Sequence, residues 1–535
     1  MQSSAFVRLI SNRPVLTHRN VAIRLPEAAP SKIDFKDTEL AFATKTSGEL
    51  FRAWAVLYGC TFSSLTKRAD TLYNLSLKVF GGRFVHAVIE KTLFRHFCAG
   101  TNQMDITRPI QRLNAAGVGG ILDYAAESKE NDEEDVVEGK LPLQSKAQAR
   151  VHSYSSESKC DANMKIFKHA VKAVKEVSPN GFASIKLSAL GEPALMERMS
   201  VALVEIETLF STLSCNETNL SFDQFVLGWN QLFITDEKVR DKYLRDVYDR
   251  FDANRDDAVD IVDWLGSMSL MDLSELVNSC KEKGPLYTSA LTSEELRHMS
   301  NLLARCDDIC HMAYESNVRV MIDAEWSAIQ PAIDNITLHM QKKYNQSVDP
   351  IVFSTYQTYL VSSQVRARRD LDRARREGWT FGAKIVRGAY MIGERERARK
   401  LGIPSPIWDR YSQTEKNYHE VLALCLEDSQ AEVMVASHNE RTMQFVVAKM
   451  KQVGKNPNHV YFGQLLGMAD HLTFTLAANK FNAYKYIPYG PVDEVMPYLI
   501  RRTQENSTLL GSPAVVDERK MIFREICRRF FSFRK

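Results

Sequence analysis

Eight apolar runs separated by helical segments constrain the fold of this chain more than any other feature. The runs are rich in Val, Ile, Tyr and Phe. Most are continuously apolar, as in parallel strands buried on both faces. Helical patterns follow them, such as 357–377 after the fourth run and 413–426 after the fifth. The expected strands are 119–124, 183–189, 318–325, 351–359, 381–390, 432–439, 460–466 and 483–489. This alternation predicts an α/β fold closed into a (β/α)8 barrel, with an open doubly wound sheet as the alternative.

Composition and charge exclude several other classes of protein. The 535 residues suffice for roughly two to four domains, or for one large barrel with additions. A hydrophobic content of 44% and a formal net charge of +3 exclude a disordered chain and a strongly basic nucleic-acid binder. The nine cysteines are scattered without a CxxC pair, which argues against a disulfide framework or a zinc site and fits a reducing compartment.

The first segment has the composition of a targeting sequence. Residues 1–26 contain four arginines, interleaved apolar residues and serines, and no acid. These features predict a mitochondrial presequence, with a disordered basic tail as the alternative. Apolar residues at helical spacing follow from about 36 to 98, so we expect residues 27–105 to form an N-terminal helical arm.

Residues 200–300 separate the second and third expected strands by more than a crossover helix needs. Within them, residues 252–263 place oxygen ligands at EF-hand positions 1, 3, 5, 9 and 12. Two departures weaken the site: Asp257 stands where the loop requires glycine, and Asp263 is shorter than the usual glutamate. We therefore expect an EF-hand-like helical insertion with weak or no calcium binding, and no metal site.

Polar residues recur where the expected strands end. In a parallel barrel the functional side chains lie at the carboxyl ends of the strands. Burying so many polar groups without partners would cost a few kcal/mol each, so a shared ligand or a mutual network is the simplest explanation. The residues are Lys186, Asp323, Glu325, Gln357, Lys384, Arg387, His438, Asn439, Gln464 and Tyr486.

The helix expected over 492–511 carries an arginine pair, Arg501 and Arg502. Glu505 lies four and three residues after them, within reach on one helical face. An exposed salt-bridge ladder is one interpretation. The other is a pocket of net positive charge suited to a small carboxylate, because two guanidiniums exceed one neutralising acid.

Taken in order, several motifs resemble proline dehydrogenase, including the proline-oxidising domain of bifunctional bacterial enzymes. They are SIKLSAL, MIDAE, STYQTYL, KIVRGAY, ASHN, GQLLGM, YIPYG and YLIRRTQEN, and the likeness runs from about residue 110 to 512. The resemblance implies a distorted (β/α)8 TIM-type barrel over residues 106–519, with the last helix across its mouth.

The resemblance also implies roles for residues at the substrate site. Cations that would bind the proline carboxylate are Arg501, Arg502 and Lys186, and acids that would hold those cations are Asp323 and Glu505. Residues that would line the pocket of the pyrrolidine ring are Tyr390, Leu465 and Tyr486.

For the cofactor, the resemblance implies FAD across the strand ends, with Gln357 and Lys384 near the flavin ring. Lys384 replaces an arginine of the bacterial members, and Met391 replaces a tryptophan. The remaining cofactor contacts would be Arg387, Gly388, Ala389, His438 and Asn439. No GxGxxG motif follows a strand, which argues against a nicotinamide site.

The implied reaction is the FAD-dependent oxidation of L-proline to 1-pyrroline-5-carboxylate, the first step of proline catabolism. The alternatives are oxidation of 4-hydroxyproline and, in a different class, an inactive barrel acting as a calcium-responsive adaptor. The resemblance and the presequence together imply ubiquinone as the electron acceptor and a place in the mitochondrial matrix at the inner membrane, and no nucleic-acid partner is expected. The basic, aromatic tail 520–535 predicts either a membrane-surface helix or a helix docked on the barrel.

Overall fold

A computed structural model describes residues 33–62, 66, 68–124, 156–178, 180–235, 240–252, 255–509 and 513–532. The presequence predicted at 1–26 lies outside these residues. No helix among them is long and apolar enough to cross a membrane.

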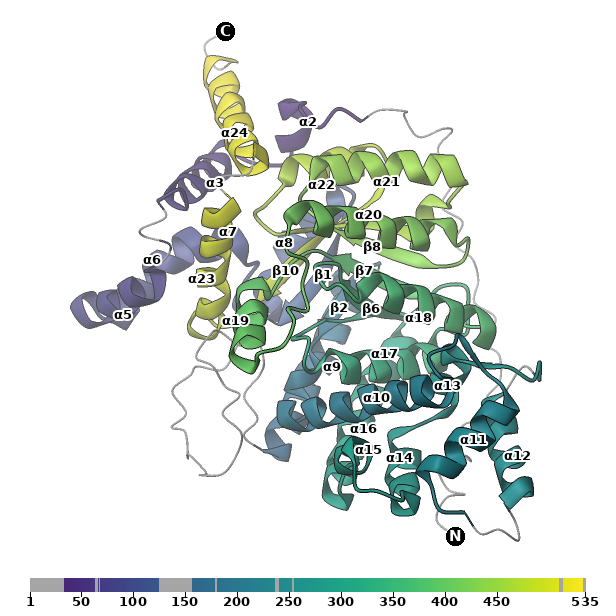
Figure 1. Cartoon of the computed structure of the whole chain (residues 1–535). Helices are drawn as coiled ribbons and strands as arrows, with labels where there is room; N and C mark the ends of the chain where they lie inside the picture. Colours follow the sequence, from purple (N-terminus) through teal and green to yellow (C-terminus); the bar gives the residue numbers. More distant parts are fainter. Residues whose placement is uncertain are drawn as a thin grey trace. The chain divides into compact units, whose positions relative to one another are not determined.

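Eight parallel strands form a closed barrel in the order β1-β10-β9-β8-β7-β6-β5-β2, so strands adjacent in the chain are neighbours in space (Figure 1). The strands are β1 (Val118–Tyr124), β2 (Phe182–Ile185), β5 (Arg319–Ile322), β6 (Val352–Gln357), β7 (Gly382–Val386), β8 (Glu432–Ala436), β9 (Val460–Leu465) and β10 (Asn482–Tyr489). Each lies within or overlaps one predicted run, and the predicted barrel is confirmed. Closure is made by β1 and β10, with Val118 opposite Ala483 and Tyr124 opposite Tyr489.

Helices connect successive strands and pack outside the barrel (Figure 1). They are α9 (Glu157–Val177), α10 (Pro193–Leu213), α16 (Ser293–Ser316), α17 (Gln330–Tyr344), α18 (Ser363–Glu377), α19 (Met391–Leu401), α20 (Tyr411–Glu427), α21 (Glu440–Val453) and α22 (Asp470–Ala478). Short 3-10 turns follow β2 and precede β9, at η2 (Leu187–Ala189) and η4 (Pro457–His459). The helix expected from residue 357 begins at Ser363, because β6 continues to Gln357.

The barrel interior is packed with side chains and leaves polar groups at the carboxyl end. Phe182 makes edge contacts with Phe353, Tyr461 and Tyr484, with ring centres 5.3 Å apart in each pair. Gly119 leaves room for this packing, since a Cβ there would come within 2.3 Å of the Tyr484 ring. Aromatic side chains therefore fill the barrel interior beneath the polar residues at the carboxyl ends of the strands.

The N-terminal arm is helical, as expected. Its elements are α2 (Thr38–Phe42), α3 (Ser47–Gly59), α5 (Ala69–Phe80), α6 (Gly82–Ile89), the π-helix η1 (Glu90–Phe94), α7 (Arg95–Phe97) and α8 (Gln103–Ala115). Phe94 and Phe97 pack with Leu499 on α23 (Val492–Leu509), the helix that follows the last barrel strand.

The C-terminal segment is a docked helix, α24 (Pro513–Ser532), which begins before the predicted residue 520. Its buried Met521 and Ile522 pack with Phe42 and Leu50 of the arm. The buried Glu525 binds Arg529, whose guanidinium also donates to the Phe42 carbonyl at 2.8 Å. The helix thus packs mainly on the arm, whereas the sequence had suggested docking on the barrel, and a role at a membrane surface stays a prediction.

The insertion contains two helix–loop–helix units whose loops pair through the antiparallel strands β3 (Asn219–Leu220) and β4 (Val259–Asp260). Its helices are α11 (Phe222–Leu232), α12 (Arg240–Phe251), α13 (Ile261–Ser267), α14 (Leu270–Leu276), η3 (Val277–Ser279) and α15 (Pro285–Ser289). Paired EF-hand-like units would have such helices and such a short sheet. The identification of the insertion as EF-hand-like stays a prediction. Within the described part of the chain, no three His, Cys, Asp or Glu side chains are grouped to hold a metal ion. Asn254, which is predicted at position 3 of the EF-hand-like loop, lies outside the described part of the chain.

Candidate active site

The side chains predicted for the site come from the carboxyl-terminal parts of seven barrel strands, from the residues that follow them, and from α23. They are Lys186, Asp323, Gln357, Lys384, Arg387, Gly388, Ala389, Tyr390, His438, Asn439, Leu465, Tyr486, Arg501 and Arg502. Glu505 also lies on α23, but its side chain is outside the described residues. Closure of the barrel therefore gathers segments that are up to about three hundred residues apart in the sequence.

Asp323 is the centre of a buried polar cluster. Its carboxylate pairs with the Lys384 ammonium and accepts a hydrogen bond of 3.0 Å from the Tyr486 hydroxyl. The Lys384 Nζ lies 5.6 Å from the centre of the Tyr486 ring. Burial raises the pKa of Asp323, but the charges of Lys384 and Lys186 outweigh it and hold the pKa below its ordinary value. Asp323 is therefore an ionised anchor for two lysines.

Glu325 lies two residues further along and has the opposite electrostatic character. It is completely buried, and burial raises its pKa to about 7, although Ser188 donates to it. Its backbone carbonyl accepts a hydrogen bond of 2.8 Å from Gln357 Nε2. The pKa values of these two buried carboxyls are thus shifted in opposite directions, because the lysine charges outweigh desolvation at Asp323 but not at Glu325.

Gln357 and Arg387 have features that fit a bound cofactor. The Gln357 Oε1 is buried and accepts no hydrogen bond from the described residues. Arg387 donates to Ser437 Oγ at 2.7 Å and to Thr442 Oγ1 at 2.6 Å, and its guanidinium lies 4.3 Å from the Tyr418 ring centre. Since Thr442 is in the first turn of α21, this places a fixed cation beside a helix N-terminus, a combination that favours phosphate.

Leu465, at the end of β9, is held by hydrogen bonds to two side chains, those of His438 and Lys485. Its backbone N–H donates to His438 Nε2 at 3.0 Å, so this nitrogen acts as the acceptor. Lys485 donates to the Leu465 carbonyl at 3.2 Å and to the Met468 carbonyl at 2.6 Å. Lys485 is itself paired with the buried Asp470 at 2.8 Å. The backbone beside the predicted ring pocket is therefore fixed from both sides.

Tyr390, the residue before α19, is buried against Trp326. Its ring centre lies 5.2 Å from that of Trp326. Gly393 permits this arrangement, because a Cβ there would lie 2.2 Å from the Trp326 ring. The adjacent cofactor candidates differ in exposure: Gly388 is exposed, whereas Ala389 is half-buried. Asn439 caps α21 by accepting a hydrogen bond of 3.2 Å from the Thr442 N–H.

The arginine pair lies on α23 against the arm. Arg502 is buried, and its Cζ lies 5.1 Å from the Tyr498 ring centre. Arg502 is also one of the charges that act on the buried Cys98 thiol, whose pKa burial raises above its ordinary value. Its burial contradicts an exposed ladder for Arg502, since a guanidinium is seldom buried without partners.

Asp123 lies near the end of β1 and is buried, although the sequence patterns above did not single it out. Burial raises the pKa of Tyr486, and the carboxylates of Asp123 and Asp323 raise it further. The signal was available, because the strand-end rule applies to the first strand as well as to the others. Trp326 carried no comparable signal, since its contact with Tyr390 arises only in the folded chain.

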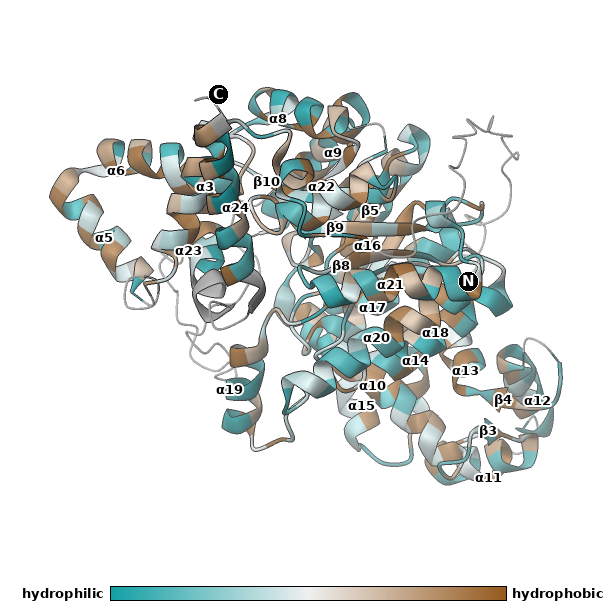
Figure 2. Cartoon of the chain, turned by 90° about the horizontal axis from the view of Figure 1, so that it is seen from above, coloured by the Kyte–Doolittle hydropathy of each residue, from teal (hydrophilic) through white to brown (hydrophobic). Residues whose placement is uncertain are grey.

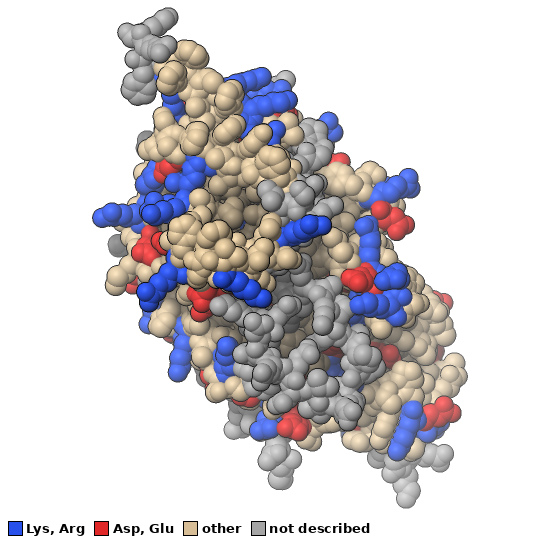
Figure 3. Space-filling view, turned by 90° about the vertical axis from the view of Figure 1, so that its left-hand side faces the viewer, with Lys and Arg blue, Asp and Glu red and all other residues tan. Residues whose placement is uncertain are grey.

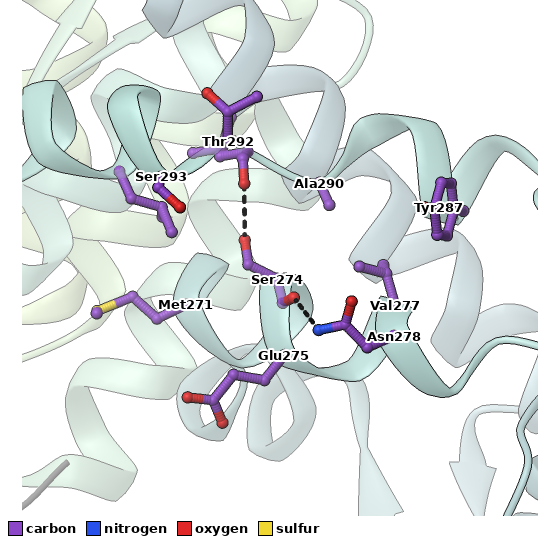
Figure 4. A pocket seen from close by; sticks show the side chains of 11 residues that line it. Met271, Ser274, Glu275, Val277, Asn278, Tyr287, Ala290, Thr292 and Ser293 are labelled. Atoms are coloured by element: carbon purple, nitrogen blue, oxygen red, sulfur yellow. Dashed lines mark hydrogen bonds between the residues drawn. The ribbon is translucent and has the colours of Figure 1, made fainter. Parts of the chain in front are cut away.

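The cavity in Figure 4 is remote from this cluster. It lies in the insertion, has a volume of about 450 Å³, and is bordered by α14, α15 and the start of α16. In it Asn278 donates to the Ser274 carbonyl at 3.4 Å. None of the predicted site residues lines it.

Comparisons with known proteins agree with the geometry. The model of the proline dehydrogenase family matches residues 106–512. Human mitochondrial proline dehydrogenase 1 is 35% identical over 564 aligned positions, which cover 95% of this chain and 91% of the human protein. The Caenorhabditis elegans protein of the same name is 33% identical, with 94% and 89% covered. Hydroxyproline dehydrogenase of Xenopus laevis is 28% identical, with 95% and 92% covered.

Among solved structures, proline utilization A from Bdellovibrio bacteriovorus, inactivated by N-propargylglycine, superposes with a TM-score of 0.52 at 15% sequence identity. The match covers 88% of this chain and 38% of the bacterial chain, and it supports the barrel fold. The family match spans most of the sequence, and the curated relatives cover nearly the whole chain. This chain belongs to the proline dehydrogenase family of oxidoreductases.

Proposed function

We propose that this protein oxidises L-proline to 1-pyrroline-5-carboxylate with FAD bound across the strand ends and a quinone as electron acceptor. The observation that carries the proposal is the buried cluster of Asp323, Lys384 and Tyr486 at the barrel end of a proline dehydrogenase family member. An adaptor without activity would not need to keep this costly set of buried charges.

The residues fit a flavin nucleotide. The Gln357 Oε1 is a buried acceptor suited to an N–H donor of a flavin ring. Arg387 follows β7 and donates to Thr442 in the first turn of α21, which suits it to the pyrophosphate. Gly388 and Ala389 are next to it in the sequence, and His438 and Asn439 follow the adjacent strand β8. When bound, the flavin would supply the hydride acceptor.

The chain's own residues would bind and orient the substrate. Arg501, Arg502 and Lys186 would hold the carboxylate, and the ionised Asp323 would hold Lys186 and Lys384 in place. Leu465, Tyr390 and Tyr486 would surround the pyrrolidine ring and exclude water. Loss of hydride from C5 leaves a carbon–nitrogen double bond stabilised by the nitrogen lone pair, so the protein needs no nucleophile, only a neutral amine in fixed orientation.

The substrate is proline in preference to 4-hydroxyproline. The Tyr486 ring is held by its hydroxyl contacts to Asp323 at 3.0 Å and Ser184 at 3.2 Å, so it cannot easily move away from an added hydroxyl. The higher identity to proline dehydrogenases than to hydroxyproline dehydrogenase supports the same choice.

A quinone acceptor dissolves in a membrane, so we propose that the enzyme works in the matrix at the inner-membrane surface. The relatives named mitochondrial support the compartment. The basic residues of 1–26 would supply the presequence.

The visible spectrum of the purified protein tests the proposal. Flavin bands near about 370 and 450 nm are expected, and L-proline should bleach them without oxygen. A protein that lacks these bands, or keeps them unchanged in L-proline, would contradict the proposed function. Equal bleaching by 4-hydroxyproline would contradict the substrate alone.

A further inference from the structure

Helices α5 and α6 bury very little of their surface against the rest of the chain. Among their described side chains, only Val85 is buried. Tyr73 and Ile89 pack partly against the cluster formed by α3, α7 and α23. The Tyr73 hydroxyl also meets His86 Nε2 at 3.0 Å, which joins the two helices on their inner side. The opposite side of this helix pair faces away from the body.

That outer side is apolar, and we call it the hairpin face. Its side chains are exposed by 38% to 63%, and Figure 2 shows the two helices extending from the body with hydrophobic residues along them. An amphipathic helix of a globular protein would place polar residues there. The hairpin face consists of Leu72, Leu75, Val79, Phe80, Phe84 and Val88.

Exposed phenylalanine is restricted to one part of the molecule. Every exposed phenylalanine among the described side chains lies in the N-terminal arm or on α24, and none lies on the barrel or the insertion. They are Phe51, Phe62, Phe80, Phe84, Phe523, Phe530 and Phe531. Scattered apolar residues on a surface are ordinary, but a contiguous patch marks an interaction.

Basic residues accompany the hairpin face. Between residues 69 and 95 the sequence has four lysines and arginines and two acids, Asp70 and Glu90. The four bases, Lys78, Arg83, Lys91 and Arg95, are exposed. Figure 3 shows the side of the molecule that carries these helices, where broad uncharged areas are bordered mainly by lysine and arginine. Apolar side chains edged with positive charge complement an anionic lipid surface.

We propose that the hairpin face docks the enzyme on an anionic bilayer, with its apolar side chains at the boundary between headgroups and acyl chains. Helices α5 and α6 have 12 and 8 residues, too short to cross a bilayer, so they would lie in its surface. The element continues through η1 into α7, whose Phe97 packs with α23, the helix that carries Arg501 and Arg502. This proposal rests on the proposed quinone acceptor, which dissolves in the membrane. Docking through the hairpin face would bring the segment that contacts α23 to the membrane that contains the quinone.

Sedimentation of the full-length holoenzyme with phosphatidylcholine vesicles, with and without cardiolipin, tests the proposal. The double variant Phe80→Ser/Phe84→Ser is expected to lower partitioning onto cardiolipin vesicles at least about tenfold, since two rings lose their transfer from water. The matched control is Phe530→Ser/Phe531→Ser on the exposed side of α24, which removes two rings elsewhere and should sediment like the wild type. A second variant, Lys78→Glu/Arg83→Glu, keeps the rings and should lose the preference for cardiolipin.

Three results would overturn the proposal. The hairpin variants could partition like the wild type, the α24 control alone could lose sedimentation, or the wild type could fail to bind vesicles. A wild-type dimer that becomes monomeric in the hairpin variants, with vesicle binding unchanged, would assign the face to a second copy of the chain. Bleaching of the flavin bands by L-proline, measured without vesicles, tests the proposed function separately. Hairpin variants whose flavin bleaches normally but that fail to sediment with vesicles would support docking. A protein that never bleaches yet loses sedimentation only in the hairpin variants contradicts the function and leaves docking supported.

Discussion

At the carboxyl end of the barrel Asp323 meets Lys384, and in the insertion Asp260 and Asp263 meet Arg376 on α18. The Lys384 side chain is 7% exposed, whereas that of Arg376 is 36% exposed. At the barrel end one ionised carboxylate faces two lysines. In the loop one guanidinium faces three carboxylates, those of Asp260, Asp263 and Asp372.

The difference in burial gives the two clusters different consequences. Breaking a buried pair leaves an uncompensated charge that costs several kcal/mol, whereas an exposed pair contributes little. In the loop, Arg376 already supplies a cation to two carboxylates that a calcium ion would need.

The largest effect is expected from Asp323→Asn, which removes the anion between Lys384 and Lys186. We expect the free energy of unfolding at pH 7 to fall by about 3–5 kcal/mol. Because the pKa of Asp323 is lowered in the folded state, its contribution is present above the ordinary pKa near about 4 and is lost as the pH falls through the folded value. Urea unfolding at pH 7 and at lower pH measures both.

The matched control for Asp323 is Glu325→Gln. Burial raises the pKa of Glu325 to about 7, so an uncharged glutamine resembles the state that is already well populated at neutral pH. Its effect should stay within about 1 kcal/mol. Equal losses for the two variants would show that the barrel-end charges do not differ as their surroundings predict.

Arg502→Met should raise KM for L-proline steeply while FAD stays bound. Losing a buried charge-assisted contact to the carboxylate should cost about 2–5 kcal/mol in kcat/KM. Glu505→Ala should cost less, since it keeps both guanidiniums. Steady-state kinetics with a soluble dye measures these effects, and the exposed Arg399→Met on α19 is the control. Unchanged kcat/KM in Arg502→Met would exclude this arginine from the carboxylate site.

A smaller effect is expected for the selectivity between L-proline and 4-hydroxyproline, which we expect Tyr486 to determine. We expect L-proline to be preferred over 4-hydroxyproline by at least about tenfold in kcat/KM, the scale of steric discrimination in a pocket. Tyr486→Phe keeps the ring but loses the hydroxyl contact to Asp323, so it should narrow this preference by freeing the ring. Competition assays with both substrates decide it, and equal turnover by the wild type would remove the assignment.

The smallest effect is expected from calcium. With Asp257 at position 6, Asp263 at position 12 and Arg376 bound to two of the carboxylates, the loop should bind calcium no tighter than about 10⁻⁴ M. Isothermal titration measures this affinity. Micromolar binding would show that the exposed Arg376 pairs yield to calcium and would restore a regulatory role for the insertion.

Much of the barrel could be predicted because burial on both faces leaves a local trace, a continuous apolar run. The ends of the strands could not, because the run continues after the hydrogen-bonded ladder stops. The expected strand 318–325 ends at Ile322, and the expected strand 381–390 ends at Val386. Asp323 and Arg387 therefore project from the ends of strands that were predicted as longer.

The sequence determined the order of the strands, their polar ends and the family motifs, since each depends on residues close together in the chain. Only the tertiary structure decided that Asp323 pairs with Lys384, and that Glu525 is buried while the side chains of the hairpin face remain exposed. Local periodicity shows that a helix has an apolar face. Which helix face is covered depends on surfaces brought together from distant parts of the chain. For this reason one face of α24 is buried against the arm, whereas the apolar outer side of α5 stays exposed.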